Sequence, residues 1–258
     1  MQASSAMSSQ AAVTERERAA HGAPRVPAGA LLGVVFDGAL AVVAAFAIVH
    51  GLALGNDVVW RTAAGVLVGG GLLLIMTSQH LRARSFGVAN GVTLVRGALT
   101  MLLAALIGAA GGEALAWTVV ALAVIAVALD GVDGWLARSR NEHTAFGARF
   151  DMETDALLIL VLAALVWQLD KAGVWILAAG LLRYAFVLAS YPLPWMERAL
   201  PPSRRRQAVC VLQIVSLIGA LLPGVRPPWS GAAALAGLAL LAWSFAIDVV
   251  WLARRAHA

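Results

Sequence analysis

Four aspartates stand close together in a very apolar sequence, and they are the residues best suited to do chemistry. Asp130 and Asp133 are three residues apart, and Asp151 and Asp155 are four apart. On helices these spacings place each pair on one face. A hairpin between the two helices would bring both pairs together. A carboxylate set without His or Cys favours the hard divalent cations Mg²⁺ and Mn²⁺.

Clustered carboxylates in apolar surroundings need partners. An aspartate in the middle of a membrane span costs about 3 kcal/mol, and four neighbouring anions repel one another. The nearby cations Arg138, Arg140 and Arg149 are too few and too peripheral to pair with all of them. Two divalent ions about 4 Å apart would suit the cluster and would indicate phosphoryl transfer. The alternative is that the acids pair with loop arginines or line a water-filled cleft.

Small residues accompany the aspartates. Gly134 and Ala137 share the helical face of Asp130 and Asp133, and Gly147 precedes Asp151 by one turn. Such residues leave a hollow beside the carboxylates in which an extended ligand fits. A purely structural cluster would not need that hollow.

The elements that must position these residues are predicted to be membrane-spanning helices. Hydrophobic residues make up 61% of the 258 residues and charged residues 13%, which is typical of a polytopic membrane protein. Because a lipid-exposed backbone must satisfy its own hydrogen bonds, we expect an all-α fold. Eight apolar stretches fit helices, at about residues 28–54, 62–78, 92–110, 115–138, 148–168, 173–190, 207–222 and 230–253.

The charge pattern predicts the orientation of the chain. Residues 1–27 lack the apolar core of a signal peptide, and we expect them to form a disordered cytoplasmic tail. Most arginines fall in loops on the side of that tail, whereas the opposite loops hold only Arg61, Lys171 and Arg226. The positive-inside rule therefore places the loop between the aspartate pairs in the cytoplasm. The net charge of +5 thus reflects topology, and no nucleic-acid partner is expected.

The stretch around the aspartates resembles the signature of the CDP-alcohol phosphotransferase (CDP-alcohol phosphatidyltransferase) family. That signature is D-x-x-D-G-x-x-A-R-x8-G-x-x-x-D-x-x-x-D. Every fixed position is filled, by Asp130, Asp133, Gly134, Ala137, Arg138, Gly147, Asp151 and Asp155.

A weaker resemblance to the same family lies upstream. Its members often carry N-x-x-T-x-x-R at the start of their first core helix, and Asn90, Thr93 and Arg96 fit this pattern. The alternative is that Asn90 is only a helix N-cap and Arg96 an interfacial arginine.

The resemblance implies a reaction and a role for each matching residue. An acceptor hydroxyl would attack the phosphorus of a CDP-linked alcohol, CMP would leave, and a phosphodiester would remain. Asp130, Asp133 and Asp151 would bind the metal ions, and Asp155 would be the catalytic base and could also touch a metal. The CDP site would comprise Asp130, Asp133, Gly134, Ala137, Arg138, Gly147, Asn90, Thr93 and Arg96.

The resemblance also implies an architecture. It predicts a homodimer and six core helices over residues 92–253, within a catalytic domain of residues 79–258. The spans in residues 28–78 would then be an extra N-terminal hairpin. We expect phosphatidyl transfer from CDP-diacylglycerol in a bacterial inner (cytoplasmic) membrane, with the site on the cytoplasmic side. The alternative is that the donor is a soluble CDP-alcohol and the acceptor is diacylglycerol.

Other polar residues within or beside the spans suggest further roles. Arg183, Arg204 and Arg205 are candidates to bind the acceptor, although anchoring at the membrane surface explains the latter two equally well. We expect Asp37 and Asp248 to be structurally paired. The lone Cys210 is interpreted as a small apolar filler.

Two other functional classes remain as alternatives. A Mg²⁺-dependent membrane prenyltransferase also uses aspartates, but the N-D-x-x-D-x-x-x-D run expected of that class is absent from the sequence. A divalent-cation transporter would carry polar or broken helices in two related halves, whereas these acids lie in one hairpin.

Overall fold

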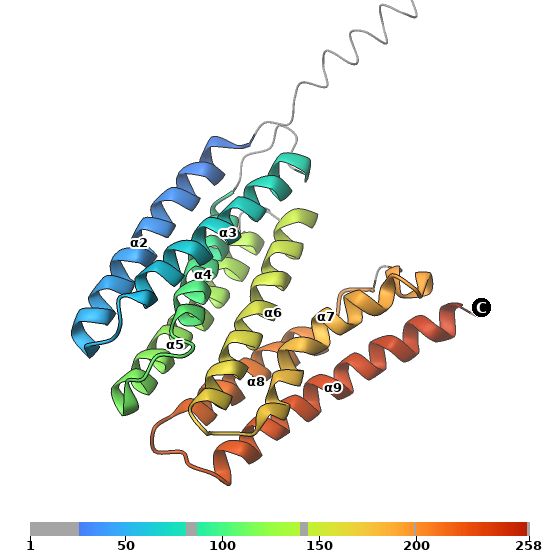
Figure 1. Cartoon of the computed structure of the whole chain (residues 1–258). Coiled ribbons are helices and arrows are strands. Elements are labelled where there is room, and N and C mark those ends of the chain that lie inside the picture. Colours follow the sequence, from blue (N-terminus) through green and yellow to red (C-terminus); the bar gives the residue numbers. More distant parts are fainter. Residues whose placement is uncertain (1–25, 81–86, 140–143, 199, 257–258) are drawn as a thin grey trace, which may run out of the picture.

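The chain folds into a bundle of helices (Figure 1). The computed structural model describes residues 26–80, 87–139, 144–198 and 200–256, and this part of the chain contains no strand. The α-helices are α2 (Ala28–Leu52), α3 (Asp57–His80), α4 (Val88–Ala105), α5 (Gly112–Ser139), α6 (Ala145–Gln168), α7 (Ala178–Ser190), α8 (Arg204–Leu221) and α9 (Trp229–Ala256). Two short 3₁₀ helices, η1 (Val174–Leu177) and η2 (Pro194–Glu197), flank α7. The predicted all-α fold is confirmed, with the helices at the predicted stretches.

The surface of the bundle is apolar, as expected for an integral membrane protein. Five of the described helices are long and apolar enough to cross a bilayer: α2, α3, α4, α5 and α9. On their outer faces Leu32 is 69% exposed, Phe36 70% and Leu67 75%. Large exposed apolar surfaces of this kind belong against lipid. The helices α6 and α8 are less uniformly apolar, because acids interrupt the first and three arginines begin the second.

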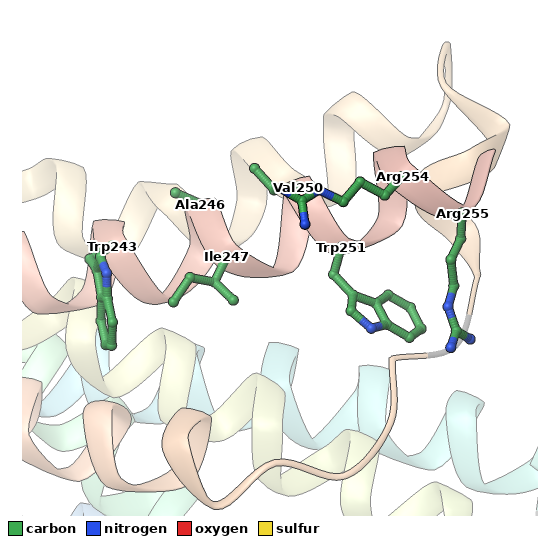
Figure 2. Close-up of a pocket in the computed structure, with 7 residues that line it drawn as sticks. All are labelled: Trp243, Ala246, Ile247, Val250, Trp251, Arg254 and Arg255. Atoms are coloured by element: carbon green, nitrogen blue, oxygen red, sulfur yellow. The ribbon is translucent and has the colours of Figure 1, made fainter. Parts of the chain in front are cut away.

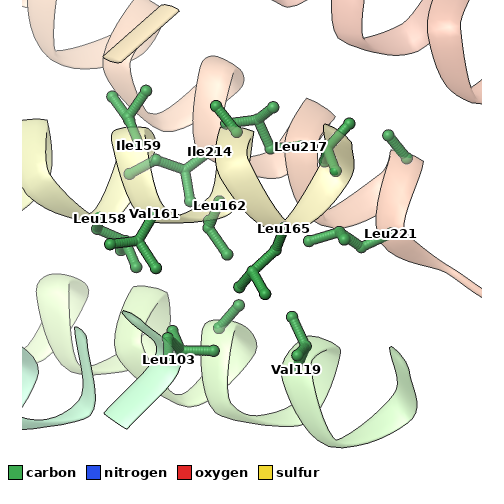
Figure 3. Packing of buried hydrophobic residues seen from close by; sticks show 14 of the residues in the cluster. Leu103, Val119, Leu158, Ile159, Val161, Leu162, Leu165, Ile214, Leu217 and Leu221 are labelled. Carbon is green, nitrogen blue, oxygen red and sulfur yellow. The ribbon is translucent and has the colours of Figure 1, made fainter. Parts of the chain in front are cut away.

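The helix α6 lies in the middle of the bundle. It packs against α4 on one side and against α7 and α8 on the other, while α2 and α3 form a hairpin that packs on α4 (Figure 1). A central helix must be apolar on most of its circumference, and α6 is: Leu158, Leu162 and Leu165 are at most 1% exposed. Its core contacts include Leu103 of α4 and Leu217 of α8 (Figure 3).

Hydrogen bonds fix the C-terminal end of α6. Gln168 accepts from the Gly108 amide at 2.6 Å and donates to the Ala109 carbonyl at 3.1 Å. The Lys171 ammonium donates to the carbonyls of Leu222 at 3.0 Å and Val225 at 2.6 Å. These contacts tie α6 to the α4–α5 and α8–α9 connections, so the aspartates at its other end stand on an anchored helix.

Close packing between α6 and α7 requires a glycine. A Cβ atom built on Gly180 would collide with the backbone and side chain of Leu160, whereas one on Gly219 of α8 would meet no neighbouring atom within 4 Å in the described structure. Backbone cannot move aside as a flexible side chain can. The approach of α7 to α6 therefore depends on the missing side chain.

We predict opposite effects of alanine at these two glycines. Gly180→Ala should lower the free energy of unfolding by about 1–3 kcal/mol through overpacking. Gly219→Ala, the matched control, should leave it unchanged or raise it by about 0.5–1 kcal/mol, because alanine favours the helix. Unfolding of the purified protein in detergent measures both. Equal stability of the two variants would contradict the proposed packing.

Candidate active site

The helix α4 supplies the first side chains of the site. It begins at Val88 after Gly87, whose backbone has φ 76° and forms the N-cap. Asn90 thus lies inside the helix, and the alternative that it is the N-cap is wrong. With Thr93 and Arg96 it recurs every third residue, which keeps the three side chains near one face of the helix. That face packs toward α5 and α6.

The aspartates come from the helices on either side of the predicted loop. Asp130 and Asp133 lie near the C-terminal end of α5, and Asp151 and Asp155 lie in the second and third turns of α6. Thr144 is the N-cap of α6 and accepts a hydrogen bond from the Gly147 amide at 2.9 Å, which satisfies a free amide of the first turn. The two helices therefore present their carboxylates to α4 together.

Arg96 is the centre of the cluster. Its side chain is 1% exposed. Its Nη1 lies 2.9 Å from Asp130 Oδ1, 2.9 Å from Asp133 Oδ2 and 2.6 Å from Asp151 Oδ1, and its Nη2 pairs with Asp155 Oδ1. One guanidinium therefore contacts all four carboxylates. Sequence reasoning considered only loop arginines as partners and missed this role, although an arginine within a span was a signal for it.

The cluster keeps an excess of negative charge. Arg96 offsets one of four carboxylate charges, and Thr93 adds a hydrogen bond to Asp133 at 3.1 Å. One carboxylate oxygen from each of Asp130, Asp151 and Asp155 lies within 4.8 Å of the other two. Hard oxygen donors that converge in this way suit Mg²⁺ or Mn²⁺. The residues present therefore fit the divalent metal that was predicted.

Gly147 allows α4 and α6 to approach each other at the site. A Cβ atom at this position would lie 2.7 Å from Asn90 Oδ1 and 3.1 Å from Thr144 Oγ1. Any other residue would push the Asn90 amide away. The structure thus adds a packing reason for a glycine that the sequence analysis had interpreted as space for a ligand and as part of the CDP site.

Two of the three predicted acceptor residues, Arg183 and Arg205, contact other acids. Arg183 of α7 pairs with Glu153 of α6 at 2.5 Å. Arg205 pairs with Asp248 of α9 at 2.5 Å and donates to Ser244, so the expected pairing of Asp248 is present. Arg204 is exposed at the start of α8. In the described structure none of the three arginines contacts the four aspartates.

Some residues differ from the expectation or lie beyond the description. Cys210 of α8 was interpreted as an apolar filler, but its Sγ lies 3.6 Å from Asp155 Oδ2 and donates to it. Only the folded bundle reveals this contact, because α8 is far from α6 in sequence. Gly134 is partly exposed on α5. The side chains of Ala137 and Arg138 lie outside the described structure.

A hollow on the surface lies in a different region. It has a volume of about 430 Å³ and lies along α9 between Trp243 and Arg255 (Figure 2). Its lining contains none of the aspartates. The Arg255 guanidinium stands 4.2 Å from the centre of the Trp251 ring. Tryptophan and arginine at the end of a span are typical of anchoring at the membrane surface, which explains this region without chemistry.

Comparison with known proteins identifies the bundle that carries the site. The family model for CDP-alcohol phosphatidyltransferase matches residues 86–250, a segment that begins just before α4, ends in α9 and contains all four aspartates. Curated proteins and solved structures gave no match. Since the matched segment is more than half of the chain, this protein belongs to the CDP-alcohol phosphatidyltransferase family, as the signature residues had indicated.

Proposed function

We propose that this protein transfers a phosphatidyl group from CDP-diacylglycerol to the hydroxyl of an alcohol acceptor and releases CMP. Its family is one of phospholipid-synthesising transferases. The observation that carries the proposal is the convergence of Asp130, Asp133, Asp151 and Asp155 around Arg96. A carboxylate cluster that holds divalent cations would suit a reaction on a diphosphate, because the cations would offset the charge that develops as the leaving group departs.

The aspartates are proposed to hold two divalent ions, Mg²⁺ or Mn²⁺. Bound there, the ions would neutralise the diphosphate and polarise its phosphorus for attack. Asp130, Asp151 and Asp155 have converging oxygens that support this role. Asp133 is only 5% exposed and is held by Thr93 and Arg96, so its orientation is the most fixed of the four.

Arg96 acts as a positioning residue in this proposal. Carboxylates forced together in an apolar bundle repel one another, and a buried arginine shared by all four reduces that cost. Thr93 and Asn90 hold the same face of α4 against α5 and α6. Together with Gly134, Ala137, Arg138 and Gly147, these residues are proposed to bind the CDP part of the donor.

Asp155 is proposed to be the general base. The acceptor oxygen forms a bond to phosphorus, the bond from phosphorus to the CMP oxygen breaks, and the acceptor proton passes to the Asp155 carboxylate. Asp155 lies one turn deeper in α6 than Asp151, and its side chain is 19% exposed against 42%. A lipid-soluble acceptor would approach from that deeper side. Arg183, Arg204 and Arg205 remain candidates to bind a charged acceptor.

The architecture and location are further parts of the proposal. The six helices from α4 to α9 would form the catalytic domain, and α2 and α3 would be an added hairpin, because the family match begins at residue 86. We propose a homodimer in a bacterial inner membrane with the site facing the cytoplasm. The family match supports this enzyme over a prenyltransferase or a cation transporter.

Loss of a metal-binding carboxylate should abolish transfer. Asp130→Asn, Asp133→Asn and Asp151→Asn should each lower the rate of CMP release by at least about a hundredfold, while a chelator should stop the unmodified protein until Mg²⁺ is restored. The control Asp57→Asn removes an exposed carboxylate of α3 and should keep full activity. CMP release from a panel of CDP donors and acceptors, with the lipid product identified by mass spectrometry, measures this. Full turnover in excess chelator would refute the metal assignment.

Replacement of the base should separate donor binding from transfer. Asp155→Asn should remove transfer because an amide cannot take the acceptor proton, yet retain most of the affinity for the CDP donor in the presence of Mg²⁺. Asp130→Asn should weaken both. Titration of the donor into each variant decides the matter. An equal loss of donor affinity in both variants would make Asp155 chiefly a metal ligand.

The orientation is tested with single added cysteines. Asn141→Cys, in the loop between the aspartate pairs, should react only with a reagent that reaches the cytoplasm. Asn56→Cys, in the exposed α2–α3 connection, should react from outside intact cells. The unmodified chain, with its single Cys210, gives the background. The reverse labelling pattern would invert the proposed topology.

A further inference from the structure

A second cavity lies between the N-terminal hairpin and the helices of the site. It has a volume of about 210 Å³, and its wall is formed by residues of α2, α3, α4 and α6. Most of that wall is apolar, with Leu73, Leu94 and Leu157 among its members. Gly97 of α4 also lines it, and a Cβ atom there would meet no neighbouring atom within 4 Å in the described structure. The cavity therefore has space beside Gly97.

One carboxylate of this cavity has no partner among the residues that the structure describes. Asp37, in the third turn of α2, lines the cavity and is 9% exposed. Within the described part of the chain it makes no hydrogen bond and no ion pair, contrary to the expected pairing. The other acid of the lining, Glu153, is paired with Arg183. Burial of an unpartnered carboxylate is costly, so Asp37 points to a ligand group that donates a hydrogen bond.

The cavity is separate from the aspartate cluster. On α4 it is lined by Leu94 and Gly97, whereas Thr93 and Arg96 face the aspartates. The hairpin that completes the cavity lies outside the matched segment, residues 86–250. A ligand here would consequently contact the back of the catalytic helices and would not occupy the metal site.

We infer that this cavity binds a compact membrane-soluble alcohol whose hydroxyl donates a hydrogen bond to Asp37. An apolar cavity of about 150 Å³ accommodates benzene, and pockets for drug-sized molecules begin at about 300 Å³. The volume of about 210 Å³ thus suits a molecule somewhat larger than benzene. We choose a hydroxyl over an ammonium group because it donates a hydrogen bond without the desolvation cost that a second ion incurs in the hydrocarbon region. The bilayer concentrates such amphiphiles, so they would reach the cavity from the lipid around α2 and α3.

Photolabelling of the full-length protein in lipid nanodiscs tests this inference. The probes are a diazirine-bearing octanol and its methyl ether, which lacks the hydroxyl proton. The alcohol should label the α2, α3 and α4 segments that line the cavity about 2- to 12-fold more than the ether, the range expected for one hydrogen bond. Excess octanol should compete. Asp37→Leu should reduce labelling by the alcohol to the level of the ether.

A second pair of variants tests the location. Gly97→Leu should fill the cavity and remove most labelling. Gly71→Leu, the matched control on α3, adds the same side chain where no neighbouring atom lies within 4 Å and outside the cavity lining, and it should label as the unmodified protein does. If Gly97→Leu does not fold, the test rests on the labelling of the unmodified protein and of Asp37→Leu by the alcohol and by the ether.

Three results would overturn the inference. Equal labelling by alcohol and ether would show a merely apolar cavity, and unchanged labelling of Asp37→Leu would exclude Asp37 as the acceptor. Displacement of the alcohol by octylamine at much lower concentration than by octanol would show a cation site. CMP release, measured on the same samples, reports the transferase function separately.

Discussion

The structure depends on a single buried arginine that holds four carboxylates together inside a membrane bundle. Arg96 contacts Asp130, Asp133, Asp151 and Asp155, which come from two helices and would otherwise repel one another. In an apolar interior each unpaired charge is far more costly than in water. The arginine reduces that cost without removing it, since it compensates only one of the four carboxylate charges. The remaining negative charge suits divalent cations, which prefer carboxylate oxygens.

The packing around α6 serves this arrangement. The helix carries two of the aspartates at one end and is buried on most of its surface, and its other end is tied to loops through Gln168 and Lys171. Glycines allow the close contacts: Gly180 admits α7, and Gly147 admits the Asn90 side chain of α4. Rigid support of this kind is what a catalytic constellation requires, because a small displacement of its groups costs much of the rate.

The helix α4 connects the two parts of the molecule. One face presents Thr93 and Arg96 to the aspartates, and a neighbouring face forms the cavity with the N-terminal hairpin. The hairpin is therefore in contact with the helix that organises the site, although it contributes none of the four carboxylates. A molecule bound at Asp37 would contact α4, the helix that also carries Arg96. Binding next to the N-terminal hairpin would therefore affect the position of the helix that holds the aspartates.

The sequence alone determined the helices and the chemistry of the cluster. Apolar length predicted each span, because a lipid-exposed backbone leaves no alternative to helices. The spacing of the aspartates predicted two converging pairs, since helical periodicity is local. The tertiary structure decided which side chains pair with one another. Arg96 lies 34 to 59 residues from the aspartates, so only packing shows that it contacts all four. The same reason applies to Cys210 beside Asp155 and to Asp248 with Arg205. It also applies to Asp37, because no local pattern showed that it lacks a partner in the described part of the chain.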